Sequence, residues 1–480
     1  MFHTSRQYLF FVVTNMPMQR IKAQINEQIL LYPFSVIILL YIAFYGIFIT
    51  HGFAPSEINL WFLIIFIPII LIDCFKTVLE CSVSNTFAST NTTEDLKKIT
   101  VIIPTKDGGS TLEATLKDLL VKFKPKQIIV ASNGSTDDTC EIARKYKVKL
   151  LDIKKPIGKI DAINAALALV NTEYCITMDD DVLIGDAFIP TELLKKASGV
   201  AFRVLPKIEN WVTKIQAHEY RKSMDVGKNF HNSSATVQNI SGAIGLFRTK
   251  ELIRQINFHT GEFSGEDLQR TLLIHLAKED NRVLLSESIV ETEVPNTLTS
   301  LYKQRVFGWG PGLLSNTKNL LKILIKKDTH LKLRYEAFYT LFLVLIMDPL
   351  RLIALPILIW YPTITIVVYL FYVLLELIPY LKLKRQEPLW VIFVTPIYGL
   401  FNFLARVTGS LVFLYRRIAV FLAKKPRLDD YRTVEIKYRL ASLIISCFIF
   451  ALIITAVTII IKPLVSSTLF QTIVSFSFVL

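Results

Sequence analysis

Long apolar runs occupy both ends of this 480-residue chain, before residue 83 and after residue 335, and a polar segment separates them. A transmembrane helix needs about 20 consecutive, mostly apolar residues. The stretches that meet this length are Leu31–Thr50, Leu60–Leu79, Tyr335–Trp360, Thr363–Leu381 and Leu440–Ile461. The pattern predicts a polar domain inserted between two groups of α-helical transmembrane segments.

Three further apolar segments are not clear transmembrane spans. Trp390–Leu414 is either one span or a surface or re-entrant segment, since basic residues flank it on both sides. Leu464–Leu480 is barely long enough to cross a bilayer. Leu313–Lys327 mixes Leu and Ile with Lys, which is typical of an amphipathic helix at the membrane interface. The number of C-terminal crossings therefore stays open.

The formal net charge is +14, and much of the basic excess lies beside apolar segments. This distribution is typical of positive-inside topology and of contact with membrane lipids. Arg6, Arg20 and Lys22 precede the first span, which predicts a cytosolic N-terminus and, after two crossings, a cytosolic polar segment. No recognition motif accompanies the charge, so we expect no nucleic-acid partner. The prediction is a multi-pass protein of the cell or plasma membrane.

These features divide the chain into five parts. They are a cytosolic N-terminal segment (1–30), a transmembrane hairpin (31–82), a cytosolic α/β domain (83–310), interfacial amphipathic helices (311–334) and a C-terminal transmembrane region (335–480). Within the 83–310 part, residues Ser84–Lys98 are expected to form a linker that precedes the first strand.

Beyond this linker, short apolar runs alternate with helical patterns. The predicted strands are Ile99–Pro104, Gln127–Ser132, Val148–Ile153 and Tyr174–Met178, and the predicted helices are Ser110–Phe123, Thr136–Tyr146 and Lys159–Val170. Ser110 and Glu113 have the spacing of a capping box at the start of the first helix. Strands that alternate with helices indicate a parallel α/β sheet, which binds ligands at the carboxyl ends of its strands.

Polar residues follow these strands. The fourth strand ends in Asp179-Asp180-Asp181, and three adjacent carboxylates repel one another unless a cation neutralises them. Oxygen ligands suit Mg²⁺ or Mn²⁺, which in turn hold phosphate oxygens; a solvated acidic turn is the alternative. Gly158-Lys159 opens a helix, where backbone N–H groups and a lysine can hold an anion.

The ordered motifs resemble those of family 2 glycosyltransferases with a GT-A fold, of the hyaluronan, chitin and cellulose synthase type. The resemblance covers Ile99–Trp309 and rests on Ser132–Asp137, Gly158–Asn164, Asp179–Asp181, Ser241–Ala243 with Phe247-Arg248, Gly265–Asp267 and Val290–Trp309. It implies a GT-A (Rossmann-like) catalytic domain that transfers a sugar from a nucleotide-sugar donor, with a UDP-sugar expected.

The resemblance also implies roles for individual residues. Asp267 is the expected catalytic base, with Glu266 beside it, and Asp179 and Asp181 are the expected ligands of Mg²⁺ or Mn²⁺. The expected donor-binding residues are Pro104, Thr105, Asp107, Asn133, Lys159, Asp179 and Arg305. The expected acceptor-binding residues are Ser241, Gly242, Gln304 and Trp309. For Trp309, an interfacial membrane anchor is an equally good interpretation.

Two departures from the family pattern affect the functional interpretation. Asn133 stands where the family usually carries Asp, and the last motif has one extra residue, with no Arg beside Trp309. Two hypotheses therefore stay open: a processive inverting polysaccharide synthase that passes its product through its own helices, and a non-processive transferase with a lipid acceptor. A nucleotide-regulated transporter or receptor is a third, from another class; it needs no base opposite a metal.

Overall fold

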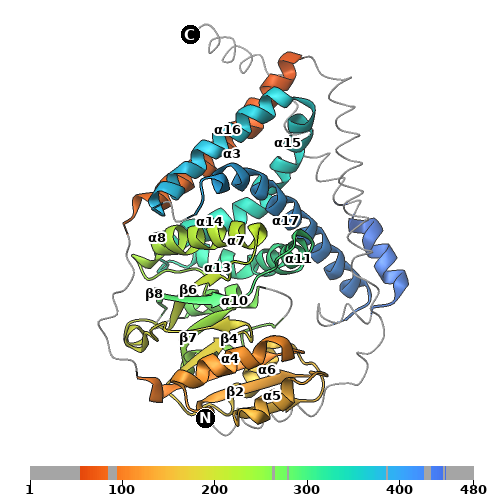
Figure 1. Ribbon diagram of the computed structural model, residues 1–480. Coiled ribbons are helices and arrows are strands. Elements are labelled where there is room, and N and C mark those ends of the chain that lie inside the picture. The colour runs from red at the N-terminus through yellow and green to blue at the C-terminus, as the bar shows by residue number, and fades with distance from the viewer. Residues whose placement is uncertain are drawn as a thin grey trace. The chain divides into compact units, whose positions relative to one another are not determined.

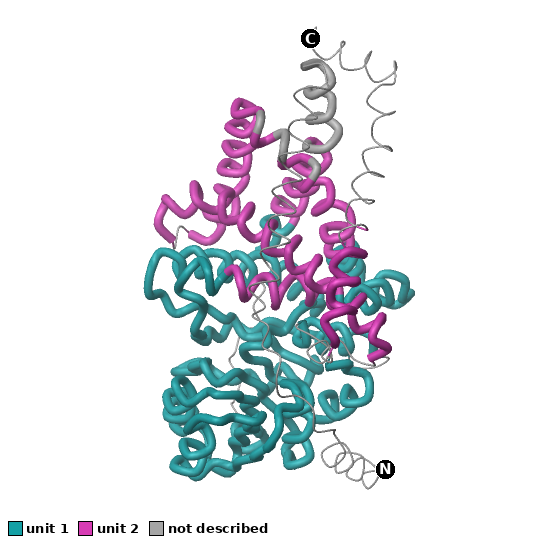
Figure 2. The backbone as a smooth tube through the Cα atoms, turned by 90° about the vertical axis from the view of Figure 1, so that its right-hand side faces the viewer, with its two compact units in different colours: residues 1–19, 80–301, 315–338 teal, residues 20–79, 302–314, 339–480 magenta. Residues whose placement is uncertain are grey.

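The computed structural model describes residues 55–84, 95–261, 265–277, 281–384, 387–425, 434–446 and 449. These residues form two compact units (Figure 2): unit 1 comprises residues 80–301 and 315–338, and unit 2 comprises residues 55–79, 302–314 and 339–449. Several predictions fall outside the described residues. They concern the segment 1–30, the span Leu31–Thr50, most of the linker, most of Leu440–Ile461, and Leu464–Leu480.

Unit 1 is built on one eight-stranded sheet with the order β3-β2-β1-β4-β7-β6-β8-β5. The strands are β1 (Ile99–Thr105), β2 (Ile128–Asn133), β3 (Lys149–Ile153), β4 (Tyr174–Met178), β5 (Val182–Leu183), β6 (Gly199–Pro206), β7 (Ile244–Arg248) and β8 (Val283–Thr292). The first four are parallel, as predicted, but β7 runs antiparallel to both β4 and β6. The α/β class is confirmed, and the sheet as a whole is mixed.

Helices connect and cover these strands (Figure 1). They are α4 (Gly109–Lys122), α5 (Thr139–Lys145), α6 (Lys159–Leu167), α7 (Trp211–Arg221), α8 (Asn229–Asn232), α9 (Thr249–Gln255), α10 (Glu266–Leu276), α11 (Leu298–Gln304) and α13 (Thr317–Ile325). Short 3₁₀ turns lie at Leu96–Lys98, Pro125–Gln127 and Thr191–Lys195, and a π-helix, η4, at Lys222–Lys228. The three helices predicted from the sequence correspond to α4, α5 and α6, and each predicted start and end lies within three residues of the observed one.

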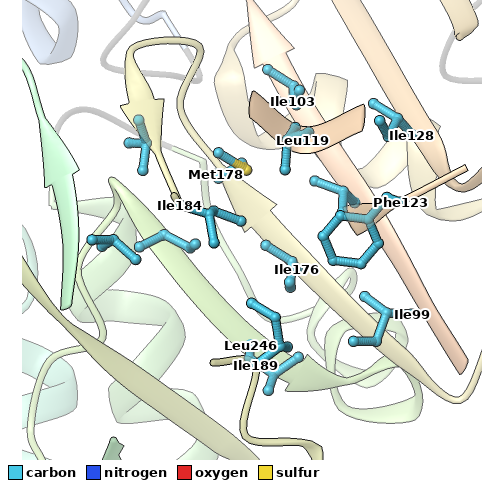
Figure 3. Close-up of a cluster of buried hydrophobic side chains, with 14 of the residues drawn as sticks. Ile99, Ile103, Leu119, Phe123, Ile128, Ile176, Met178, Ile184, Ile189 and Leu246 are labelled. Carbon is cyan, nitrogen blue, oxygen red and sulfur yellow. The ribbon is translucent and has the colours of Figure 1, made fainter. Parts of the chain in front are cut away.

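The apolar side chains of the strands form a core on each face of the sheet. On one face, Ile99 and Ile103 of β1 belong to the same buried cluster as Leu119 of α4 (Figure 3). On the other face, alternate residues of the same strands pack with α6, α9 and α10. Burying each such Leu or Ile contributes about 1.5–3 kcal/mol. The two cores therefore hold the strands in place, and with them the residues that follow the strand ends.

The predicted capping box at Ser110 is wrong. The cap residue is Gly108, and no side chain caps the helix. Glu113 instead accepts hydrogen bonds from Lys145 Nζ and Tyr146 Oη, both at 2.8 Å, and so connects α4 to α5. The carboxylate gains a stronger partner in a lysine than it would find in a backbone N–H group.

Unit 2 consists of helices. They are α3 (Pro55–Ser82), the π-helix η5 (Arg305–Trp309), α12 (Gly310–Ser315), the run α14 (Leu331–Phe342), η6 (Leu343–Met347) and α15 (Asp348–Trp360), then α16 (Pro362–Lys382) and α17 (Trp390–Leu422). Parts of α3, α12 and α14 belong to unit 1, and residues 302–304 of α11 belong to unit 2. Among the described residues, α16 and α17 are the two helices long and apolar enough to cross a membrane. The ambiguous segment Trp390–Leu414 is therefore part of a single helix of 33 residues.

Four charged residues within the apolar helices of unit 2, Asp73, Asp348, Arg351 and Arg406, form ion pairs. Asp73 accepts hydrogen bonds from Arg351 Nη2 and Tyr372 Oη, each at 2.7 Å. Asp348 accepts two from Arg406, at 2.6 and 2.7 Å. Since an unpaired charge among apolar side chains costs several kcal/mol, these pairs explain how α3, α15 and α17 tolerate their charged residues.

Candidate active site

The carboxyl ends of β1, β2 and β4 lie at one edge of the unit 1 sheet, and polar side chains gather there. Asp179, Asp180 and Asp181 follow β4 directly. The antiparallel neighbour of β4 is β7, and Asp179 N donates to Ala243 O at 2.8 Å just before β7 begins. This pairing brings Ser241 and Gly242 to the same edge as the aspartates.

Lys159 links three parts of the chain at this edge. It is the first residue of α6, after Gly158 at a φ of 106°, which a glycine adopts without strain. Its Nζ lies 2.7 Å from Asp179 Oδ1 and 3.4 Å from Glu266 Oε1. Burial opposes the charged form, but the Asp179 and Glu266 carboxylates outweigh it and raise the pKa of Lys159. A permanent positive charge therefore lies between β4 and α10.

Glu266 and Asp267 begin α10, whose cap residue is Gly265. Asp267 Oδ2 accepts from Gly242 N at 3.2 Å and from Asn239 Nδ2 at 3.3 Å, and Oδ1 accepts from Leu268 N at 2.8 Å. Burial and the adjacent Glu266 carboxylate raise the pKa of Asp267. The side chain is thus held in one orientation with a higher proton affinity than an ordinary aspartate, as a general base requires.

The aspartates after β4 carry an excess of negative charge. Burial raises the pKa of Asp181 to about 7, and three neighbouring carboxylates add to the rise. They belong to Asp179, Asp180 and Glu293. A divalent cation would remove this repulsion, and a donor set of carboxylate oxygens is the one that Mg²⁺ and Mn²⁺ prefer. The residues present therefore fit such an ion.

The loops after β1 and β2 are joined to each other and to the aspartates. Thr105 Oγ1 donates to Asp180 Oδ2, and a Cβ on Gly108 would meet the same oxygen, so a larger residue there would displace the Asp180 side chain. Asp107 Oδ1 accepts from Thr136 N at 2.8 Å, which ties the first loop to the second. These contacts give the sheet edge a defined shape.

Asn133, the last residue of β2, is buried, and its Oδ1 accepts from Ile157 N at 2.7 Å. The amide oxygen is therefore used to hold the segment before Lys159. The Nδ2 group is the donor that this residue can offer to a ligand, which an aspartate at this position would lack.

A small cavity opens between β4, the start of β7 and α10. Its lining includes Pro104, Lys159, Asp179, Gly242, Glu266 and Asp267. A Cβ on Gly242 would lie 3.7 Å from both Asp267 Oδ2 and Lys159 Nζ, so any larger residue would extend between the acid and the lysine. Ser241 is adjacent, and its Oγ accepts from Ala243 N at 3.4 Å.

The remaining predicted site residues belong to unit 2. Gln304 ends α11, and Arg305 and Trp309 bound η5. Arg305 is buried, donates to Tyr398 Oη at 3.2 Å, and stacks over the Trp309 ring at 3.5 Å from its centroid. Trp309 is 47% exposed, so one face of its ring meets Arg305 while part of the residue reaches solvent. Their roles toward donor and acceptor stay predictions.

Sequence reasoning assigned no role to several residues that shape this site. Asn239 holds Asp267, Arg270 lines the cavity and donates to Thr177 Oγ1 at 3.1 Å, and Glu293 acts on the charge of Asp181. Arg270 could have been found, because it lies four residues after Glu266 on the same face of a helix. Asn239 has no local signal, since it reaches Asp267 through the fold alone.

Comparison with known families agrees with this geometry. Residues 100–248 match the model of glycosyl transferase family 2. This chain contains a family 2 glycosyltransferase domain. The family 2 domain, with its GT-A α/β fold, therefore includes β1 to β7, Lys159 and the three aspartates, while α10 lies just beyond the matched segment.

Individual proteins resemble the family 2 domain at low identity. A poly-β-1,6-N-acetyl-D-glucosamine synthase of Staphylococcus epidermidis is 26% identical over 230 residues, 46% of this chain and 55% of that protein. The corresponding synthase of Staphylococcus aureus is 27% identical over 234 residues, with the same shares. The chain thus spans about half the length of these relatives. A mannosyltransferase of Pyrobaculum calidifontis, solved with GDP-mannose and Mn²⁺, is 14% identical, covering 74% of this chain and 98% of its own, with a TM-score of 0.49.

Proposed function

We propose that this protein is an inverting membrane glycosyltransferase that transfers a sugar from a UDP-sugar to a growing polysaccharide chain on the cytosolic face. The observation that carries the proposal is the convergence of Asp179, Lys159 and Asp267 at the carboxyl edge of a family 2 domain. A leaving group that gains negative charge needs cations, and an acceptor hydroxyl needs a base. The site supplies both within one cavity.

The donor side of the reaction belongs to the aspartates and Lys159. Asp179 and Asp181 would hold Mg²⁺ or Mn²⁺, and the bound ion would neutralise negative charge on the diphosphate leaving group. Lys159 lies 2.7 Å from Asp179, close enough for its charge to stabilise the same phosphate oxygens. Pro104, Thr105 and Asn133 at the strand ends, with Asp107 in the loop after β1, form the surface on which the nucleoside would rest.

The acceptor side belongs to Asp267. Its Oδ2 already accepts two hydrogen bonds, from Gly242 and Asn239, so the carboxylate is oriented before the acceptor arrives. It would take the proton from the acceptor hydroxyl as that oxygen attacks the anomeric carbon opposite the leaving group. Ser241 and Gly242 would border the acceptor.

The base assignment predicts a pH dependence. Burial and Glu266 raise the pKa of Asp267, and a base must be ionised to act, so kcat should fall as the pH is lowered through this raised pKa. Glu266→Gln removes the like charge, lowers the pKa of Asp267 and moves the acid limb to lower pH. The measurement is kcat against pH for both proteins. A limb that stays in place or moves to higher pH would count against the base assignment.

The N-acetylglucosamine polymer named for the staphylococcal relatives supports a polysaccharide product and makes UDP-N-acetylglucosamine the first donor to test. The apolar helices α16 and α17 support a multi-pass membrane location, in contact with lipid, with the family 2 domain in the cytosol. The alternative is a single transfer to a lipid acceptor, which the altered motif before Trp309 keeps open.

Product size separates these two functions. The purified protein should be incubated with labelled UDP-N-acetylglucosamine and Mg²⁺ or Mn²⁺. A processive enzyme yields long chains at low turnover, and Trp309→Ala should then stop elongation while sparing slow donor hydrolysis, because the ring no longer supports the terminal sugar. Leu331→Ala, which removes another exposed large apolar side chain, is the control. Lipid-extractable products that carry one sugar, with no polymer at any donor concentration, would decide for the alternative.

A further inference from the structure

A second group of potential metal ligands lies in unit 1 and shares no residue with the active site. Glu80, His231 and Glu336 each offer one ligand atom within 4.8 Å of the other two. Glu80 lies near the end of α3, His231 in α8 and Glu336 in α14. Three segments far apart in the sequence therefore converge on one point.

His231 lies at the centre of this group and is only 4% exposed. Its Nε2 lies 3.3 Å from Glu336 Oε2, while its Nδ1 has no hydrogen-bond partner among the described residues. Because Nε2 is the ring nitrogen beside the Glu336 carboxylate, it is the atom of His231 that can bind a metal there. The ring is also held in place, because the Phe230 ring packs edge-on against it with centroids 5.1 Å apart.

Hydrogen bonds connect α8 to the segments that carry the other two ligands. Asn229 Nδ2 donates to Ser84 O at 3.0 Å, which ties α8 to the chain after Glu80. Lys332 Nζ donates to Phe230 O at 2.9 Å, which ties α14 to α8 (Figure 1). The Glu80 carboxylate faces the backbone of η4, since a Cβ on Gly227 would lie 3.8 Å from its Oε2.

The spacing and chemistry of the ligands match zinc. In a tetrahedral site with bonds of about 2.0–2.1 Å, two ligand atoms lie about 3.4 Å apart, close to the 3.3 Å between His231 and Glu336. The Glu80 carboxylate lies within 4.8 Å of the other two ligand atoms, and both glutamates are partly exposed. Two carboxylates and a neutral imidazole carry two negative charges, which one Zn²⁺ neutralises.

We propose that Glu80, His231 and Glu336 bind one Zn²⁺, with water as the fourth ligand. The site would cross-link two places where the described chain changes units: Glu80, where it enters unit 1, and Glu336, two residues before it leaves after Phe338. It does not depend on the proposed function, because none of its ligands takes part in the transfer.

The test uses the full chain in detergent, without nucleotide, with Asp181→Asn present in every sample to remove binding at the aspartates. After treatment with chelator and addition of Zn²⁺, retained zinc is counted by mass spectrometry following gel filtration, and Tm is recorded with and without zinc. We expect about one zinc per chain and a rise in Tm with zinc. Glu336→Gln and Glu80→Gln should each weaken zinc binding by at least about 10²-fold, because even outer-shell changes cost about 10–100-fold.

Asp328→Asn is the matched control, since it removes an exposed carboxylate shortly before α14 and should retain the zinc. Both glutamate variants keep the volume of the side chain, and Tm without zinc reports whether they fold. Zinc content that is the same in Glu336→Gln as in its parent, or a parent that retains no zinc, would overturn the site and leave an ordinary ion pair between His231 and Glu336.

Discussion

Asp267→Asn is expected to lower the rate of sugar transfer by at least about 10²-fold, because general-base catalysis contributes about 10²–10⁴-fold. The asparagine has nearly the same volume and can still accept from Leu268 N, so the start of α10 should keep its structure. It cannot take up the acceptor proton. The rate of transfer is measured with saturating donor and acceptor.

Nucleotide affinity distinguishes this role from a structural one. Asp267 is assigned to the acceptor side, so UDP binding in the presence of metal should change little in the variant. Calorimetric titration of wild type and Asp267→Asn with UDP provides the comparison. A variant that loses affinity for UDP but keeps its turnover rate would show that Asp267 belongs to the donor side.

Asp181→Asn should lower turnover by about 10³-fold or more, because the metal contributes several kcal/mol and each 1.36 kcal/mol corresponds to a factor of ten in rate. The raised pKa of Asp181, about 7, shows how strongly its surroundings disfavour a bare carboxylate. Excess EDTA should reduce the wild-type protein to a similar rate, and Mn²⁺ or Mg²⁺ should restore it.

Asp186→Asn is the matched control for this variant. It removes an exposed carboxylate five residues further along the same segment and should leave both turnover and metal dependence unchanged. Wild-type protein that retains full activity in excess EDTA would refute the metal assignment, whatever the variants do.

The parallel half of the sheet could be predicted because each strand is a short apolar run that ends in turn residues. β4 has the predicted bounds, Tyr174–Met178, and the aspartates that follow it lie at the expected edge. Local sequence contains this information because both faces of these strands are buried, so apolar character continues to the residue where the strand ends.

The remainder of the sheet could not be predicted, since it depends on pairing between distant segments. β7 pairs antiparallel with β4 although about 70 residues separate them, and this pairing brings Gly242 beside Asp267 and Lys159. No periodicity specifies such a partner. The functional grouping of Lys159 with Asp267 came from family resemblance, and contacts such as that of Asn239 with Asp267 emerge only in the folded chain.

The central claim is that the site formed by Asp179, Asp181, Lys159 and Asp267 transfers sugar from a UDP-sugar. The most direct measurement is the release of UDP by the purified protein from a panel of UDP- and GDP-sugars, with Mn²⁺ or Mg²⁺ and with EDTA, for the wild type and Asp181→Asn. We predict metal-dependent release of UDP from at least one UDP-sugar, accompanied by labelled glycan or glycolipid and absent in the variant. UDP release that is equal in the wild type and Asp181→Asn, or no release from any donor by folded protein with metal, would contradict the account.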